Sequence, residues 1–344
     1  MQKILMKDVR GFYYAGSWGT SALDLWQHFD NGTMAVEIAR GKRYFPGWNV
    51  ARWFLSHESY QRNPEKFLAN FEAGLAIFAR NGIQVMPTLF NRWRDPVCDF
   101  GGISLEHIVS GLGSWCQPDY FSSVDRPSTN AGSIHEMFAG YVKAVVGGHS
   151  TDERIFAWDI CNEPLMGPYA SDPDSPVREA ELRWLSWSGE MCRTAGVTQP
   201  LTIGCNPAIN VIEMTESIVD FISFHPYYIP TPHPERGAFG VGTKAGFESF
   251  LDEVVDFAKR SGKDVLANET VWGALDDEEH VDIMRYTLGE LVKRGLGFLA
   301  VGLHHSLTAD LHAAAYGPVG WPGRLEFINS DGSLRQGHEA FNEF

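Results

Sequence analysis

The stretch W-D-I-C-N-E-P, residues 158–164, is the most informative part of this 344-residue sequence. It completes an apolar run of strand length that begins at Arg154 and stops at Pro164, since proline cannot continue regular strand pairing. The sequence therefore predicts Glu163 at the C-terminal end of a buried strand. A carboxylate in that position costs desolvation free energy unless it has a partner or a task. In a parallel barrel, active sites are built at this end of the strands.

A second glutamate is predicted at the same position of a later strand. Glu269 closes the mainly apolar run 265–269. Glycoside hydrolysis needs two carboxyl groups that flank the scissile bond, and retaining enzymes hold them about 5 Å apart. One carboxyl group protonates the leaving oxygen and the other attacks the anomeric carbon. Either glutamate alone is open to interpretation as a surface residue in a loop, but the matched pair predicts this chemistry.

The rest of the chain alternates between runs typical of buried strands and runs of helical period, which is the β-α-β pattern. Eight strands are predicted, over residues 9–15, 49–55, 83–90, 154–161, 201–205, 220–224, 265–268 and 297–303. Helices are predicted over residues 63–82, 178–194, 247–260 and 278–293, and one more must lie within 91–153. We therefore expect an α/β fold of the (β/α)8 TIM-barrel class, with residues 1–344 forming a single catalytic domain.

Three predicted connections are longer than about 15 residues, a length that is usually functional in a compact domain. They cover roughly residues 91–133, 227–246 and 304–325, and each follows a strand. All three are therefore expected on the catalytic face. Long loops could wall off a pocket, which favours exo action on short oligosaccharides. An open cleft would instead favour an endo-acting β-glucanase, mannanase or xylanase.

Composition limits the partners of the chain. Its 28 Lys and Arg residues against 43 Asp and Glu residues give a net charge of −15, which disfavours nucleic acid and anionic membranes. The sequence contains no apolar run of about 20 residues and no N-terminal run typical of a signal peptide. We expect a cytoplasmic protein as the sequence stands, or a secreted or periplasmic one if a signal peptide has been removed. Arg92 and Arg94 leave a charged sugar possible as substrate.

The sequence has five cysteines, an odd number. Cys161 and Cys205 fall in strand-like runs and are predicted to be buried thiols. Cys98 and Cys116 share a long connection and could pair with each other.

Several polar residues are predicted to surround the two glutamates. His225 and Tyr227 are two positions apart and share a face if the chain is extended there. A tyrosine hydroxyl that donates to the nucleophile would keep that carboxylate ionised. Arg52 is a candidate partner for Glu269, and Asn162 for the sugar hydroxyl next to the anomeric carbon. The alternatives are a core histidine at His225 and a surface salt bridge at Arg52.

These motifs resemble the clan A retaining glycoside hydrolases, most nearly the cellulase-like family five. The matching positions, in the order of the family, are Arg52, Asn162-Glu163-Pro164, His225-x-Tyr227 and Glu269. The resemblance implies that Glu163 is the acid/base and Glu269 the nucleophile of a reaction with net retention. It also implies a carbohydrate substrate and the absence of both a metal ion and an organic cofactor.

Two strand ends depart from the family pattern, which suggests a divergent member or a neighbouring family. The third strand ends in Asn91, where the family usually has histidine. The eighth ends in Leu303-His304, where the family usually has a tryptophan that forms the floor of the subsite for the attacked sugar. Trp272 or Trp321 could replace that tryptophan.

Further aromatic residues are predicted on the catalytic face, where rings stack on sugar faces. Trp18 and Trp93 are candidates for this role, and hydrophobic packing is the alternative. Two other functions remain open from the sequence. One is a carbohydrate-binding barrel without catalysis, although the presence of both carboxylates argues against it. The other is a metal-dependent hydrolase that uses His225, His304 and His305.

Overall fold

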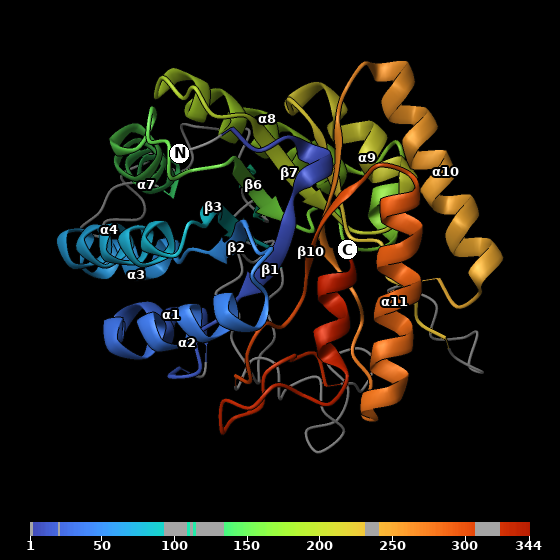
Figure 1. The fold of residues 1–344 in the computed structure, drawn as a ribbon. Coiled ribbons are helices and arrows are strands. Elements are labelled where there is room, and N and C mark those ends of the chain that lie inside the picture. The colour runs from blue at the N-terminus through green and yellow to red at the C-terminus, as the bar shows by residue number, and fades with distance from the viewer. Residues whose placement is uncertain are drawn as a thin grey trace.

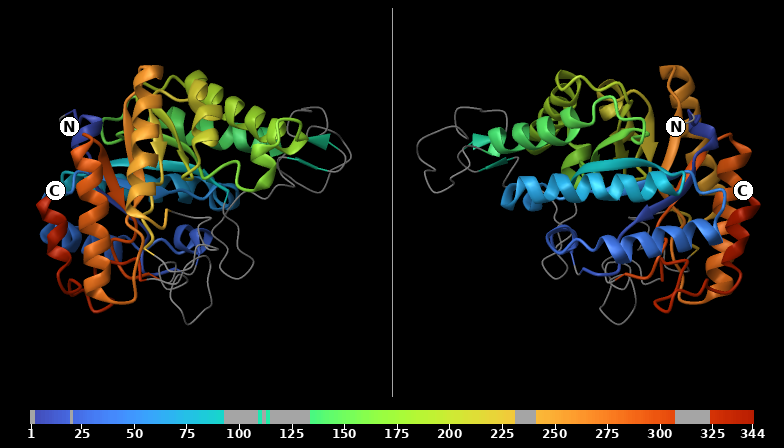
Figure 2. Two further views of the ribbon diagram at one scale, coloured as in Figure 1. Left: turned by 90° about the vertical axis from the view of Figure 1, so that its right-hand side faces the viewer. Right: turned by 60° about the vertical axis from the view of Figure 1, so that its left-hand side comes forward.

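The computed structural model describes residues 3–19, 21–92, 109–110, 113–114, 134–230, 241–306 and 324–344. Its centre is a closed barrel of parallel strands with helices around the outside (Figures 1 and 2). The order around the barrel is β1-β10-β9-β8-β7-β6-β3-β2, which confirms the predicted (β/α)8 class. The barrel strands are β1 (Arg10–Tyr14), β2 (Val50–Phe54), β3 (Gln84–Asn91), β6 (Trp158–Asn162), β7 (Leu201–Cys205), β8 (Ile222–Phe224), β9 (Val265–Thr270) and β10 (Gly297–Ala300). A separate pair joins β4 (Val109–Ser110) to β5 (Gly113–Ser114).

The helices include every one that the sequence predicts. They are α1 (Ala22–Gln27), α2 (Asn31–Tyr44), α3 (His57–Arg62), α4 (Pro64–Arg80), α7 (Ile134–Gly148), α8 (Pro176–Thr194), α9 (Ile209–Thr215), α10 (Lys244–Ser261) and α11 (Asp277–Lys293). Local signals set the start of α4, because the Asn63 side chain accepts from the Lys66 amide and Pro64 occupies the first helical position. None of the helices in the described part of the chain is both long and apolar enough to cross a membrane.

The structure differs from the sequence prediction by more than two residues at two strands. The fourth strand begins at Trp158 rather than Arg154; before it, Ile155 forms only an isolated bridge with Val85 of β3, and its own amide donates to Asp152 in a turn (3.1 Å). Pairing on the other side begins only where the Trp158 amide donates to Pro200 (2.9 Å). The eighth strand ends at Ala300 rather than residue 303, since Gly302 turns the chain with a φ of +87°.

Four helices were absent from the prediction, namely α1, α2, α3 and α9. Helices α1 and α2 both lie in the connection between β1 and β2. Helix α2 contains two glycines, which weaken helical propensity, and its face toward the barrel is narrow. One of them, Gly41, is required by packing, because a Cβ there would lie 2.9 Å from the ring of Trp48. Tertiary contacts therefore explain why α2 forms, although its composition does not predict a helix.

The interior of the barrel is filled in two layers. An apolar layer lies near the start of the strands and includes the buried residues Val50, Met86, Leu266 and Leu299. Two positions further along three of these strands the residues are polar and buried, namely Arg52, Thr88 and Asn268. Side chains two apart share a face of a strand, so these residues point into the same interior. The polar layer lies next to the C-terminal ends of the strands.

Some predictions fall wholly or partly outside the described residues. They concern most of the connections 91–133 and 304–325 and part of the connection 227–246. They also concern the residues Trp93, Arg94, Cys98, Cys116 and Trp321. The predictions for Cys161 and Cys205 are confirmed, because both are buried free thiols.

Candidate active site

The two glutamates predicted from the sequence lie together at the C-terminal end of the barrel. Glu163 directly follows β6, and Glu269 is the residue before the last one of β9. One oxygen of each carboxylate lies within 4.8 Å of the other and of a ring nitrogen of His225. Contacts across the barrel therefore unite residues that are far apart in the sequence.

The backbone is strained at both positions. Glu163 has a φ of +45°, and Val271, two residues after Glu269, has a φ of +66°. Residues other than glycine rarely adopt such angles, and a β-branched residue does so least readily. Strain of this kind persists where the surroundings over-determine the conformation, as they often do at functional sites. Here it re-aims the chain at the ends of two strands that carry carboxylates.

Glu269 is held as an anion by donors on both of its oxygens. Arg52 Nη1 donates to Oε2, and the Tyr227 hydroxyl donates to Oε1 at 2.5 Å. Burial raises the pKa of Glu269, but the neighbouring His225 and Arg52 charges and the Tyr227 hydrogen bond lower it by more. The pKa therefore lies below its ordinary value. Burial and the nearby carboxylates raise the pKa of Tyr227 well above its usual value, so the phenol remains a neutral donor.

Replacing Tyr227 by Phe is expected to lower kcat/KM about 10- to 100-fold, because a hydrogen bond to a charged group is lost. The pKa of Glu269 should rise with the loss of this donor, so the acid limb of the pH profile should move to higher pH. Kinetics on a nitrophenyl glycoside across pH measure both effects. Tyr228→Phe is the matched control, since the Tyr228 ring packs on Tyr286 (4.6 Å) outside the site. An unmoved acid limb in Tyr227→Phe would contradict the role.

Glu163 has a different set of neighbours. His225 Nδ1 lies 2.7 Å from its Oε1, and the His225 side chain is fully buried. His225 and Tyr227 thus divide between the two carboxylates, one residue to each.

Asn162 is clamped between two side chains. Its Oδ1 accepts from Arg52 Nη2 at 2.8 Å, and its Nδ2 donates to Asn91 Oδ1 at 2.9 Å. Asn91, the residue that departs from the family at the end of the third strand, therefore orients the amide next to Glu163. Because one Nδ2 hydrogen is used in this way, the other is the one available to a sugar hydroxyl.

Asp159 lies beneath these residues and was not among the predicted site residues. Its Oδ2 accepts from Arg52 Nε (2.9 Å) and Nη2 (2.6 Å), and its side chain is fully buried. The sequence did offer a signal, because Arg52 and Asp159 carry opposite charges and each lies inside an otherwise mainly apolar run. Gly204 is required beside this cluster, because a Cβ there would lie 2.6 Å from Arg52 Nη2.

Tyr13 is a second residue that the sequence analysis missed. It lies at the end of β1, half-buried, with its ring 4.6 Å from that of Phe54. It packs against the cluster that contains Tyr227 and Trp272, and burial and the charge of Glu269 raise its pKa. The backbone of Leu303, where the family usually has tryptophan, approaches the Tyr13 carbonyl at 3.5 Å. Nothing in the local pattern of the sequence distinguishes Tyr13 from its buried neighbour Tyr14.

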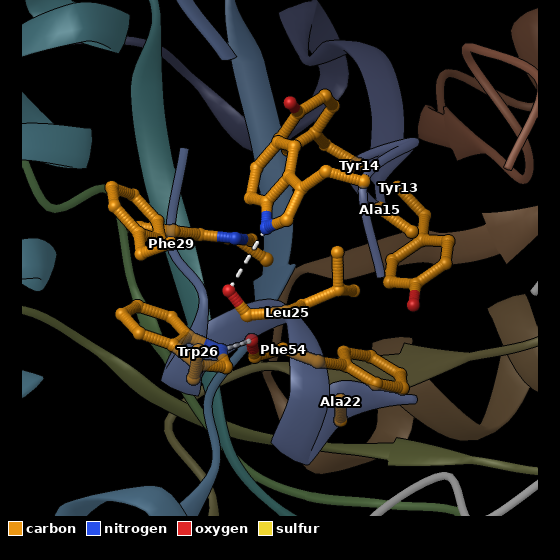
Figure 3. Close-up of a pocket in the computed structure, with 11 residues that line it drawn as sticks. Tyr13, Tyr14, Ala15, Ala22, Leu25, Trp26, Phe29 and Phe54 are labelled. Atoms are coloured by element: carbon orange, nitrogen blue, oxygen red, sulfur yellow. Dashed lines mark hydrogen bonds between the residues drawn. The ribbon is translucent and has the colours of Figure 1, made fainter. Parts of the chain in front are cut away.

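Trp18 is one of the residues that line an open hollow beside Tyr13. Figure 3 shows this hollow in close-up. The Trp18 indole donates to the carbonyl of Leu25 at 3.0 Å and packs edge-on against Phe29. In Figure 3 the Tyr13 and Phe54 rings lie together on one side of the hollow, away from Phe29. Trp18 is thus a fixed part of an aromatic wall connected to the site through Tyr13.

Three other predicted residues have mainly structural surroundings. Trp272 is buried and packs edge-on against Tyr227 at 5.1 Å, so it helps to hold that ring in place. His304 is buried, with its Nε2 2.9 Å from Arg40 and its Nδ1 3.8 Å from Glu37, both residues of α2. Arg92 is neutralised by the buried Glu181 at 2.6 Å, which removes it as a free cation for a charged sugar.

A metal ion is the other species that these side chains could hold. Glu163, His225 and Glu269 have suitable spacing, whereas neither metal-like cluster of the described residues includes His304 or His305. Both oxygens of Glu269 already accept from Arg52 and Tyr227, and the guanidinium opposes a second cation nearby. This donor set suits an ionised nucleophile better than a metal ligand.

Comparison with known proteins identifies glycoside hydrolases. No protein-family model matches the sequence. A segment of 83 residues is 29% identical to mannan endo-1,4-β-mannosidase A of Aspergillus aculeatus and covers 24% of this chain and 18% of that protein. The matches span only 18 to 23% of the length of the curated relatives.

Solved structures share the fold over the whole chain. An exo-β-1,4-mannosidase from Opitutaceae bacterium strain TAV5 has a TM-score of 0.68 at 17% identity, covering 100% of this chain and 61% of that one. A GH5-4 broad-specificity endoglucanase from Clostridium acetobutylicum has a TM-score of 0.66 at 10% identity, with 98% and 97% covered. The chain is therefore similar to family-five glycoside hydrolases, in fold throughout and in sequence over part of its length, as its motifs predicted.

Proposed function

We propose that this protein is a retaining glycoside hydrolase that cleaves β-glycosidic bonds, with Glu163 as the acid/base and Glu269 as the nucleophile. The observation that carries the proposal is the approach of the two carboxylates to within 4.8 Å. Inverting enzymes separate their carboxyl groups by about 6.5–9.5 Å to admit a water molecule, whereas retaining enzymes hold them about 5–5.5 Å apart.

The surroundings of each carboxylate fit its proposed role. Glu269, held ionised by Arg52 and Tyr227, attacks the anomeric carbon while Glu163 gives its proton to the departing glycosidic oxygen. The bond between the anomeric carbon and the leaving oxygen breaks as the ester to Glu269 forms. Glu163 then takes a proton from water, which attacks the same carbon and releases Glu269. Two inversions leave the configuration at that carbon unchanged.

β-1,4-Linked mannosides are the substrate class that we propose first. The similar exo-mannosidase and mannan endo-mannosidase support this choice by their names, and the similar endoglucanase supports β-glucans as the second candidate. The aromatic wall that includes Tyr13, Trp18 and Phe54 supports binding of neutral sugar rings, because it offers apolar faces and its Phe54 ring lies 4.8 Å from the Arg52 guanidinium.

A panel of nitrophenyl β-glycosides together with mannan, glucan and xylan oligomers tests the proposal. We expect hydrolysis of a β-mannoside or β-glucoside, with the β-anomer seen first by proton NMR. A first-formed α-anomer would disprove retention. Product lengths from a hexasaccharide separate exo action, which releases one sugar at a time, from endo action. Unchanged activity in EDTA would exclude the metal-dependent alternative, whereas lost activity restored by a metal would support it.

A further inference from the structure

Asp159 occupies the centre of the polar layer of the barrel. Its Oδ2 accepts from two nitrogens of Arg52, from Thr88 Oγ1 (3.0 Å) and from Asn268 Nδ2 (3.4 Å). Its Oδ1 accepts from the amide of Gly204 at 3.0 Å. A carboxylate with donors from four other strands is fixed in position, and it is too deeply buried to reach a substrate.

Arg52 connects Asp159 to both halves of the site. Its Nε and Nη2 face Asp159, its Nη2 also donates to Asn162, and its Nη1 donates to Glu269. The guanidinium is a rigid planar fork, so two bonds to Asp159 determine where Nη1 points. The position of Asp159 therefore determines the direction of the hydrogen bond that reaches the nucleophile.

We infer that Asp159 is a positioning residue, which orients Arg52 and offsets its positive charge so that Glu269 remains both ionised and nucleophilic. The inference rests on the proposed function. Nucleophilicity of a carboxylate falls when a neighbouring cation is not balanced, because the lone pairs are then more strongly stabilised. With Asp159 in place, one guanidinium is shared between two carboxylates.

Other charged and titratable groups also lie around Glu269, but it is Asp159 that orients Arg52 with two hydrogen bonds. Among the described residues, those whose charges act on Glu269 or lie beside it are Arg52 from β2, Tyr13 from β1, Glu163 after β6, and His225 and Tyr227 after β8. Arg52 is the residue of this group that Asp159 contacts directly. A change at Asp159 therefore reaches the charged groups around the nucleophile through Arg52, and its other contact near Glu269 is the longer hydrogen bond from Asn268 at 3.4 Å.

Asp159→Asn, Asp159→Glu and a control variant test this role on the best nitrophenyl glycoside of the panel. We expect Asp159→Asn to lower kcat/KM roughly 10- to 100-fold, mainly through kcat. The acid limb should move down by about one pH unit, because the charge of Arg52 then acts on Glu269 alone. Asp159→Glu keeps the charge but not the geometry, so kcat should fall with the acid limb in place.

Thr202→Val is the matched control. Thr202 Oγ1 lies 2.7 Å from Ser223 Oγ in the same interior, and neither residue has a hydrogen bond to Arg52. This variant removes the buried hydrogen bonds of the Thr202 hydroxyl with Ser223 and with the Phe221 carbonyl without touching the charges, so both the acid limb and kcat should stay at wild-type values. An acid limb in folded Asp159→Asn that coincides with wild type would overturn the inference and leave the proposed function intact.

A second variant covers the case in which Asp159→Asn does not fold, since it leaves Arg52 partly unpaired in the interior. The double variant Arg52→Met, Asp159→Asn removes both charges together. Compared with Arg52→Met alone, the double variant should show no further movement of the acid limb, because Asp159 then has no Arg52 through which to act; a downward movement as large as that expected of Asp159→Asn would overturn the inference.

An NMR titration gives a reading that does not depend on turnover. The pKa of Glu269 can be followed by carbon-13 NMR of glutamate-labelled protein, with Glu269→Gln for assignment. We expect a lower pKa of Glu269 in Asp159→Asn than in wild type, and equal values would overturn the inference. If wild type hydrolyses none of the glycosides, the proposed function fails while the titration still decides whether Asp159 acts on Glu269.

Discussion

Glu269→Gly is expected to lower turnover by at least about 10⁴-fold, and added azide is expected to restore it with a glycosyl azide of inverted configuration. The cause is the loss of the only carboxylate that Arg52 and the Tyr227 hydroxyl hold together in the described site. The cavity left by the side chain admits azide on the face from which Glu269 attacks. Azide then performs the first displacement and no second one follows, so a β-glycoside gives an α-glycosyl azide.

Rescue and its controls are measured on an activated dinitrophenyl glycoside, with the product anomer read by NMR. Glu326→Gln is the matched control, since Glu326 is a buried glutamate paired with Arg324 at 2.7 Å outside the two-carboxylate site. It should retain wild-type turnover. Normal turnover by Glu269→Gln would show that another residue is the nucleophile, and a retained azide product would assign Glu269 to the other role.

Glu163→Ala is expected to lower kcat/KM about 10²- to 10⁴-fold on substrates with poor leaving groups, because no proton then reaches the glycosidic oxygen. Substrates with a dinitrophenolate leaving group need no such proton, so their first step should remain fast. The glycosyl ester on Glu269 should then accumulate, because Glu163 is also the base for its hydrolysis. A burst of dinitrophenolate followed by slow turnover would be the kinetic signature.

Azide distinguishes the two carboxylates in this variant. It should speed the second step and give a glycosyl azide of retained configuration, since the first displacement by Glu269 has already occurred. Equal losses on activated and poor leaving groups, with no burst, would contradict acid/base catalysis by Glu163.

Much of the fold was predictable because its signals are local. The cap at Asn63 with Pro64 sets the start of α4, and apolar runs bounded by glycine, proline or polar residues mark the strands. Where local signals conflict with packing, prediction failed. Helix α2 has weak helical character, yet it forms because Gly41 allows close approach to Trp48. The strand predicted from Arg154 begins later because the amides of Arg154 and Ile155 donate to Asp152 in a turn.

The candidate site was predictable in part for the same reason. Pro164 marks the end of a buried strand, which locates Glu163, and the similar run before Glu269 locates the second carboxylate. The prediction that Arg52 is the partner of Glu269 agrees with the hydrogen bond between them. His304 was a misleading candidate, since its position after a strand in the sequence does not reveal that its side chain lies against Arg40 and Glu37 of α2.

By itself the sequence determined which residue types stand at the ends of the strands, and therefore that two carboxylates share one end of a barrel. Only the tertiary structure decided the neighbours of each carboxylate and the distance between the two. Asp159 meets Arg52 across 107 positions of sequence, and Tyr13 packs against the cluster of Tyr227 and Trp272 from a strand near the start of the chain. The physical reason is that barrel closure sets the register between strands, whereas periodicity and caps act within a few residues.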